Sequence, residues 1–256
     1  MVIRPVISSV IRPVIHPVIG SVIGQGGGEE LSLPSGALFD HDASILESLT
    51  FNDSTISSIA NTLNSSYAAT QSEGSRQPIL STLSNSKPAI DWQIGETSII
   101  DDSLTEEISE FTVAMVFSAS TFNQLFTRWD FDEGERQFSL RLRPSPDRLQ
   151  FTISTTGSNS ILLGSVNDIV TDTPYVLVAQ VSGTNWRMVI DGLGDISGSV
   201  ATPMFNTTAR AIQYAARFPT GDTSNCKVSQ SRFWKRYLTA EEVTQTINFL
   251  KAKWIT

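Results

Sequence analysis

The stretch QFSLRLRP, residues 137–144, decides the fold class expected for this 256-residue chain. Its apolar side chains recur at every second position, as Phe138, Leu140 and Leu142, and Ser139, Arg141 and Arg143 alternate with them. Successive side chains of a strand point to opposite faces of its sheet, so this alternation predicts a strand with one buried and one solvated face.

Similar runs flank this stretch on both sides. NWRMVIDG (185–192) repeats the alternation with Trp186, Met188 and Ile190, and its Asp191-Gly192 pair predicts a tight turn. The other runs are FTVAMVFSAS (111–120), RLQFTIST (148–155), YVLVAQVSG (175–183) and KVSQSRFWKR (227–236). Many strands at short spacing predict an all-β fold, a two-sheet sandwich.

One helix is expected, at the C-terminus. In TAEEVTQTINFLKAKW (239–254), Thr239 and Glu242 have the spacing of a capping box, and the apolar residues that follow recur at helical spacing. A second helix, or a set of turns, is the expectation for residues 41–66.

The first 24 residues repeat a Val-Ile pair every four positions. Pro5, Pro13 and Pro17 exclude a helix, and these prolines together with Arg4 and Arg12 exclude a signal peptide or membrane span. An extended arm with apolar side chains on both faces needs a partner to cover it, so we predict an assembly anchor; a disordered tail is the alternative. The anchor residues are Val2, Ile3, Val6, Ile7, Val10, Ile11, Val14, Ile15, Val18, Ile19, Val22 and Ile23.

This arm sets the predicted domain organisation. An extended N-terminal arm (1–24) is followed by a glycine-rich linker (25–34), and the sandwich with its short C-terminal helix occupies residues 35–256.

Charge and cysteine content exclude several classes of protein. The net charge is −8, and the two arginines of the arm leave −10 on the rest, so nucleic acid is excluded as a partner. Cys226 is the only cysteine, which excludes an intrachain disulfide and a zinc site made of thiolates.

Several short motifs resemble a known family in their order along the chain. They are ALFDHDASI (37–45), Ala69-Thr70-Gln71, Arg76-Gln77-Pro78, KPAIDW (87–92), WRMVIDG (186–192) and RYLTAEEVTQTINFLKAKW (236–254). Together they resemble the concanavalin A-like, laminin G-type jelly-roll domains of bacteriophage and bacterial surface proteins, over roughly residues 35–256. The resemblance implies a sandwich of two curved antiparallel sheets and a role in adhesion, glycan binding or particle decoration.

The acidic stretch WDFDEGE (129–135) carries the candidate chemistry. Glucanases on this fold place two carboxylates on one strand, but here Gly134 interrupts the alternation before Glu135, so we expect a solvated hairpin tip and no enzyme. Asp130 and Asp132 are candidate ligands of a calcium ion, the only cofactor considered. Trp129 is the candidate platform for sugar stacking. His41 lacks a nucleophile motif and is expected to be structural.

These observations lead to three hypotheses for function. The first is a bacteriophage virion protein, a capsid decoration or a head- or tail-fibre protein on the virion surface. Its arm binds other virion proteins or forms a homotrimer, its sandwich binds host or surface glycans, and it has no membrane insertion. The second is a secreted or surface carbohydrate-binding module, and the third is a glycoside hydrolase.

Overall fold

The computed structural model describes residues 31–93, 95–100, 107–120, 124–130, 134–143, 148–206, 211–215 and 225–256. The chain divides into two units, residues 1–30 and 31–256. The predicted anchor arm belongs to the first unit and lies outside the described residues, so its role stays a prediction. The account below concerns the second unit.

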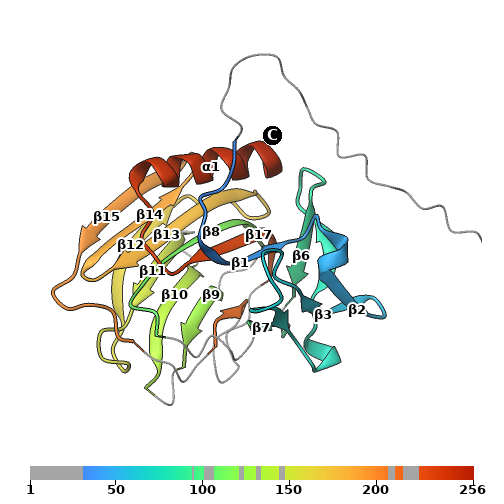
Figure 1. The fold of residues 1–256 in the computed structure, drawn as a ribbon, viewed down its shortest axis with the longest axis horizontal. Helices are drawn as coiled ribbons and strands as arrows, with labels where there is room; N and C mark the ends of the chain where they lie inside the picture. The colour runs from blue at the N-terminus through green and yellow to red at the C-terminus, as the bar shows by residue number, and fades with distance from the viewer. Residues whose placement is uncertain are drawn as a thin grey trace, which may run out of the picture. The chain divides into compact units, whose positions relative to one another are not determined.

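In the residues that the structure describes, the second unit consists mostly of strands, with one α-helix and two single turns of 3₁₀ helix (Figure 1). The first strands are β1 (Ala37–Asp42), β2 (Leu49–Asn52), β3 (Thr55–Ile59), β4 (Ala69–Thr70), β5 (Ile79–Thr82), β6 (Pro88–Trp92) and β7 (Ser98–Ile100). The next are β8 (Glu110–Ala119), β9 (Gln124–Trp129), β10 (Arg136–Arg143), β11 (Arg148–Ile153) and β12 (Ile161–Asn167). The last are β13 (Tyr175–Ser182), β14 (Asn185–Ile190), β15 (Gly194–Ser199), β16 (Gln213–Tyr214) and β17 (Cys226–Trp234). The helical segments are η1 (Leu46–Ser48), η2 (Gly74–Arg76) and α1 (Ala240–Trp254).

All recorded strand pairings are antiparallel, and they join the strands into one continuous network. From one end the order is β15, β14, β13, β8 and β17. Beside β8, the two halves of β17 pair with β1 and with β6. From β6 the network continues through β5, β3, β4, β7, β16, β9, β10, β11 and β12.

The two ends of this network meet, because β12 packs against β15. The architecture is therefore a nearly closed antiparallel sheet around one core. It is consistent with a concanavalin A-like sandwich, but the pairings do not separate it into the two sheets that the sequence predicted.

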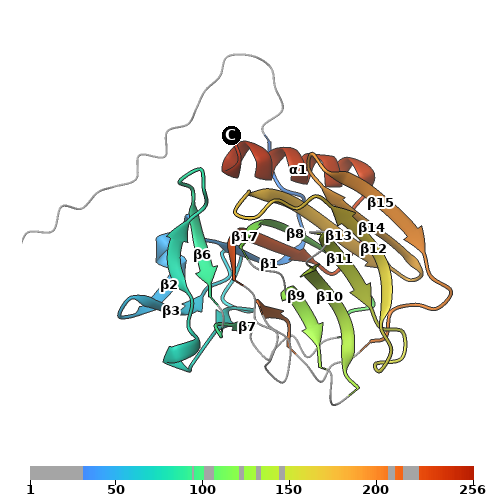
Figure 2. The ribbon, with the colours of Figure 1, turned by 180° about the vertical axis from the view of Figure 1, so that it is seen from behind.

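Central strands β8 and β13 are buried on both faces, which explains why their sequences are almost continuously apolar. Phe111, Val113, Met115 and Phe117 of β8 face the main core inside the sheet. Ala114 and Val116 face the other way and pack with Trp254 of α1. Figures 1 and 2 show α1 lying across this outer face.

The C-terminal helix forms as its sequence predicted. Thr239 Oγ1 accepts a hydrogen bond from the Glu242 amide, and the Glu242 carboxylate accepts one from the Thr239 amide. Val243, Leu250 and Trp254 are buried against the sheet. In the described part of the chain no helix has the length and hydropathy needed to cross a membrane.

Residues 41–66 contain turns, one of the two expectations for this segment, and no α-helix. They comprise the end of β1, the 3₁₀ turn η1, the strands β2 and β3, and turns at residues 43–44 and 53–54. Thr50, Ile56, Ser58 and Ile59 favour extended backbone because β-branched residues and hydroxyls suit strands and turns better than helices.

Candidate functional site

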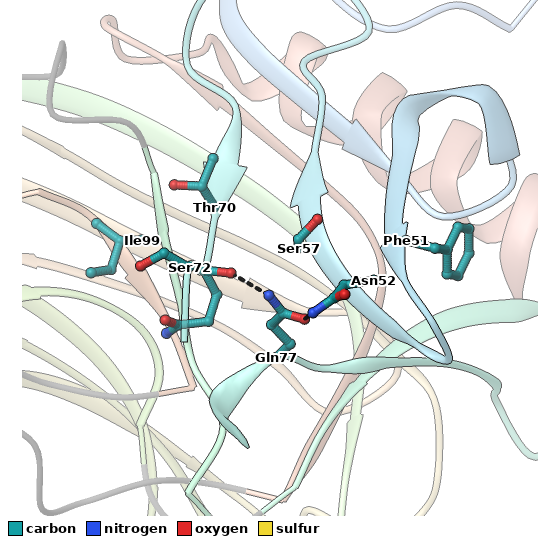
Figure 3. Close-up of a pocket in the computed structure, with 8 residues that line it drawn as sticks. Phe51, Asn52, Ser57, Thr70, Ser72, Gln77 and Ile99 are labelled. Atoms are coloured by element: carbon teal, nitrogen blue, oxygen red, sulfur yellow. Dashed lines mark hydrogen bonds between the residues drawn. The ribbon is translucent and has the colours of Figure 1, made fainter. Parts of the chain in front are cut away.

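A polar cavity of about 660 Å³ lies among β2, β3, β4 and β7 (Figure 3). All the residues that line it are uncharged: Phe51, Asn52, Ser57, Thr70, Gln71, Ser72, Gln77 and Ile99. The pairing of β4 with both β3 and β7 places Thr70 beside Ser58 and Ile99. Residues far apart in the sequence therefore meet in this cavity, which is called the β3–β7 pocket below.

Hydrogen bonds from both ends of its carboxamide fix the side chain of Gln77 in the β3–β7 pocket. Its Oε1 accepts hydrogen bonds from Thr55 Oγ1 at 2.7 Å and from Asn52 Nδ2 at 3.3 Å, and its Nε2 donates to the Gln71 carbonyl at 2.7 Å (Figure 3). Only 3% of Gln77 is exposed. These bonds fix the carboxamide before any ligand arrives, and one Nε2 hydrogen is left to donate.

The side chain of Gln71 is held in a similar way. Its Nε2 donates to the Thr97 carbonyl at 3.2 Å, and its Oε1 accepts the Glu73 amide at 3.0 Å. An oriented pair of carboxamides offers both donors and acceptors without carrying charge.

Hydroxyl groups complete the pocket. Ser57 donates to the Thr50 carbonyl at 3.1 Å, and Thr70 and Ser72 are exposed at the mouth. In Figure 3 the ring of Phe51 points away from Asn52 and Gln77, and Phe51 is 45% exposed.

One ion pair lies beside the β3–β7 pocket in the described structure. Arg76 of η2 lies 3.8 Å from the Glu73 carboxylate. The pocket is therefore suited to a neutral ligand with many hydroxyl groups rather than to an ion.

Trp129 is not the exposed sugar platform that the sequence suggested. The residue is only 5% exposed, and the Arg136 guanidinium lies over its ring at 5.9 Å from the centroid. Its neighbour Asp130 is 1% exposed. The prediction of an exposed Trp129 was wrong because the hairpin that carries it packs into the protein.

β9 and β10 pair on either side of the predicted hairpin tip, and residues 131–133 of that tip lie outside the described residues, so its predicted exposure stays a prediction. The Asp130 amide donates to the Glu135 carbonyl at 3.3 Å, and Gly134 adopts a positive φ of 71°. Asp132 lies outside the described residues, so the predicted calcium pair with Asp130 stays untested. Among the residues that the structure describes, no group of three or more His, Cys, Asp and Glu side chains is arranged to hold a metal.

The outer face of β9, β10 and β11 is more buried than its alternating sequence predicted. Ser139 was expected on a solvated face, but it is 3% exposed and donates to Gln124 Oε1 at 2.7 Å. On the inner face, Arg128 of β9 pairs with the core residue Phe138 and donates to Gln137 Oε1 at 3.1 Å, and burial lowers the pKa of Arg128 to about 10. Thr152 Oγ1 is buried on β11 without a hydrogen-bond partner in the described structure. Alternation of polar and apolar residues does not reveal that polar side chains are enclosed here.

His41 is buried on β1 and lies away from the β3–β7 pocket lining. Its Nε2 donates to the Tyr67 carbonyl at 2.8 Å, so its Nδ1 accepts from the Tyr214 hydroxyl, also at 2.8 Å. Burial lowers the pKa of His41 to about 4, which keeps the ring neutral at physiological pH. Cys226 is also buried, and burial raises the pKa of its thiol.

Known structures resemble this fold. A Trypanosoma rangeli sialidase bound to 2,3-difluoro-KDN matches 93% of this chain and 36% of its own, with a TM-score of 0.57 and 12% identity. A mutant of that sialidase displaying trans-sialidase activity matches 88% of this chain and 34% of its own, with a TM-score of 0.55 and 13% identity. The chain thus spans about a third of the length of these sialidases. At sequence identities of 12% and 13%, the similarity shows a shared fold alone.

A third similar structure is the CBM40 of a Ruminococcus gnavus IT-sialidase bound to α2,3-sialyllactose. It covers 57% of this chain and 85% of its own, with a TM-score of 0.47 and 9% identity. No protein among the curated sequences matches the chain.

The profile of one protein family matches residues 94–244, which is more than half of the chain. This match begins after the motifs of residues 37–92, so it supports the predicted resemblance through the later motifs, WRMVIDG among them. Most of the β3–β7 pocket lies before the matched segment. The strand network, the single C-terminal helix and this match agree: the chain belongs to the concanavalin A-like lectin/glucanases superfamily.

Proposed function

We propose that this chain is a carbohydrate-binding module that holds a neutral saccharide in the β3–β7 pocket. The supporting observation is the lining of the pocket, which presents carboxamides and hydroxyls and no charged group. A sugar ring offers alternating hydroxyl donors and acceptors, and oriented amides satisfy both. Because Gln71 and Gln77 are already fixed by bonds to the backbone, little side-chain entropy is lost on binding.

The same lining argues against hydrolysis in this pocket. It contains no carboxylate, imidazole, thiol or amine, so it supplies no general acid or base for glycoside cleavage. Binding without turnover is therefore the proposed activity.

Titration calorimetry with lactose, maltotriose, chitotriose and α2,3-sialyllactose tests this proposal. We expect at least one neutral oligosaccharide to bind with a dissociation constant between about 1 μM and 1 mM, and to bind more tightly than the sialylated one.

The double variant Thr70→Val/Ser72→Ala removes two exposed hydroxyls and should weaken that binding about tenfold, since each hydrogen bond contributes roughly 0.5–1.5 kcal/mol. Thr50→Val, an exposed position on β2 outside the pocket lining, is the matched control and should bind like the wild type. Absence of binding by every neutral sugar at about 10 mM, or equal weakening in both variants, contradicts the proposal.

A virion role remains a prediction of the arm sequence. The Val-Ile repeat supports it, and the arm would join the carbohydrate-binding module to other virion proteins or to two further copies. Deletion of residues 1–24 tests the idea in particles: the truncated chain should fold and bind sugar but no longer join the particle. Incorporation of the truncated chain contradicts the anchor.

A further inference from the structure

A second cavity, of about 530 Å³, lies where β13, β14 and β15 meet the segment that leads into α1. Its lining is also uncharged and comprises Ser182, Asn185, Trp186, Ser197, Gly198, Ser199 and Tyr237. It shares no residue with the β3–β7 pocket. We call it the β15 pocket.

This cavity lies where the outer face of the sheet changes from apolar to polar side chains. Under α1 that face is apolar, with Val176 and Val178 of β13 packed against the helix. At the end of β13 the same face carries Ser182, which pairs with Asn185, and Asn185 pairs with Ser199. Paired residues place their Cβ atoms about 5 Å apart, so hydroxyl, carboxamide and hydroxyl form a row across three strands.

Nothing in the described structure buries this row. Asn185 and Ser199 are exposed, and α1 begins only at Ala240, after Tyr237 has formed one side of the cavity. Asn185 has no recorded side-chain hydrogen bond, so its carboxamide is available to a ligand, whereas Ser182 donates to Glu110 Oε2 at 2.8 Å.

The Trp186 ring lies on the opposite face from this row. Trp186 pairs with Val181, belongs to the main core and is 8% exposed, and a methyl group on Gly198 would lie 3.0 Å from Trp186 Cζ2. Arg187 of β14 is held by Asp195 through two hydrogen bonds of 3.0 and 2.7 Å. The cavity therefore combines hydroxyls, a carboxamide and the side chain of Tyr237, with the Glu110 carboxylate beside it as the acceptor of the Ser182 hydrogen bond.

From these observations we infer that the β15 pocket is a second site for a neutral saccharide, which makes the chain bivalent. This inference rests on the proposed carbohydrate-binding function. In both Figures 1 and 2, β2 and β3 lie on one side of the unit, and β15 with the start of α1 lies on the other. Two sites on opposite sides can bind two glycans at once, and a chain of this kind gains avidity on a glycan-covered surface.

Amide chemical-shift mapping of the full chain with lactose, maltotriose and chitotriose tests the two pockets separately. We expect one of these sugars to shift the amides of Ser182, Asn185 and Ser199 as well as those of Thr70 and Ser72. Shifts in the β15 pocket alone contradict the first site and overturn the inference that the chain is bivalent. Shifts in the β3–β7 pocket alone overturn this inference and leave the proposed function intact. Shifts in neither pocket overturn both.

Calorimetry with the sugar that binds gives the second readout. The stoichiometry should be two sugars per chain in the wild type and one in Asn185→Ala/Ser199→Ala. The matched control is Ser165→Ala/Asn167→Ala on β12, outside both linings, which should keep two. A wild-type stoichiometry of one, or an unchanged value in Asn185→Ala/Ser199→Ala, overturns the inference.

Discussion

Acidification should destabilise this protein through His41. The folded-state pKa of His41 is about 4, because burial on β1 disfavours the imidazolium more strongly than the Tyr67 carbonyl favours it. In the unfolded chain the same ring has a pKa of 6.5. Between these two values the unfolded chain binds a proton that the folded protein excludes, so stability falls as the pH is lowered from about 7 to about 4.

The size of this loss follows from the separation of the two pKa values. Each pKa unit corresponds to about 1.4 kcal/mol, so the full shift removes roughly 3 kcal/mol. A domain of this kind is stable by about 5–15 kcal/mol, so the loss is a large share of the total. Protonation would also remove the acceptor that Nδ1 offers to the Tyr214 hydroxyl.

Urea unfolding followed by tryptophan fluorescence, at pH values between 4 and 7, measures this dependence in the wild type and in His41→Asn. Carboxylates titrate in both proteins, so the difference between their curves isolates His41. We expect the wild type to lose about 3 kcal/mol more than the variant over this range. His16→Asn, at the chain's other histidine, is the control and should follow the wild type. Parallel curves for the wild type and His41→Asn would refute the reasoning.

Two further predictions concern local packing and capping. Gly164→Ala should destabilise the fold by about 1–3 kcal/mol, because the added methyl lies 2.8 Å from the buried Trp186 ring; Gly194→Ala, with 3.5 Å to its nearest atom, should be neutral or slightly stabilising. Equal urea midpoints for the two variants would contradict this. Glu242→Gln should cost about 1 kcal/mol at pH 7, because it weakens the capping box and the Arg236 ion pair. The Arg236 hydrogen bond is the main cause that lowers the pKa of Glu242 to about 2 from 4.5, so the difference from wild type should shrink as the pH falls from about 4.5 towards 2. A difference that stays constant to pH 2 in thermal melts would argue against the capping role.

Local patterns predicted the elements they encode. The capping box at Thr239 and the alternation at Phe138, Leu140 and Leu142 involve neighbours only two to four positions apart, and the structure confirms both. The continuous closure of the sheet was not predictable in this way, because it depends on pairings such as β17 with β6 between strands distant in the sequence.

The candidate functional residues also depend on contacts between distant parts of the chain, which local sequence patterns do not predict. Trp129 was misjudged because acidic neighbours suggest exposure, while burial depends on what the folded chain places over the hairpin. Neither pocket was found, since Thr70, Gln77 and Ile99 share no periodicity in a stretch rich in serine, threonine and asparagine. Only the register of the strands brings them together.

The sequence by itself determined the all-β class of the fold and the position of the helix. These depend on side-chain period and composition, which are local properties. Tertiary structure alone decided which polar side chains stay accessible and which become enclosed, because accessibility is set by long-range strand pairing. Ser139 and Ser199 both occupy strand positions, and only the folded chain buries the first and leaves the second open.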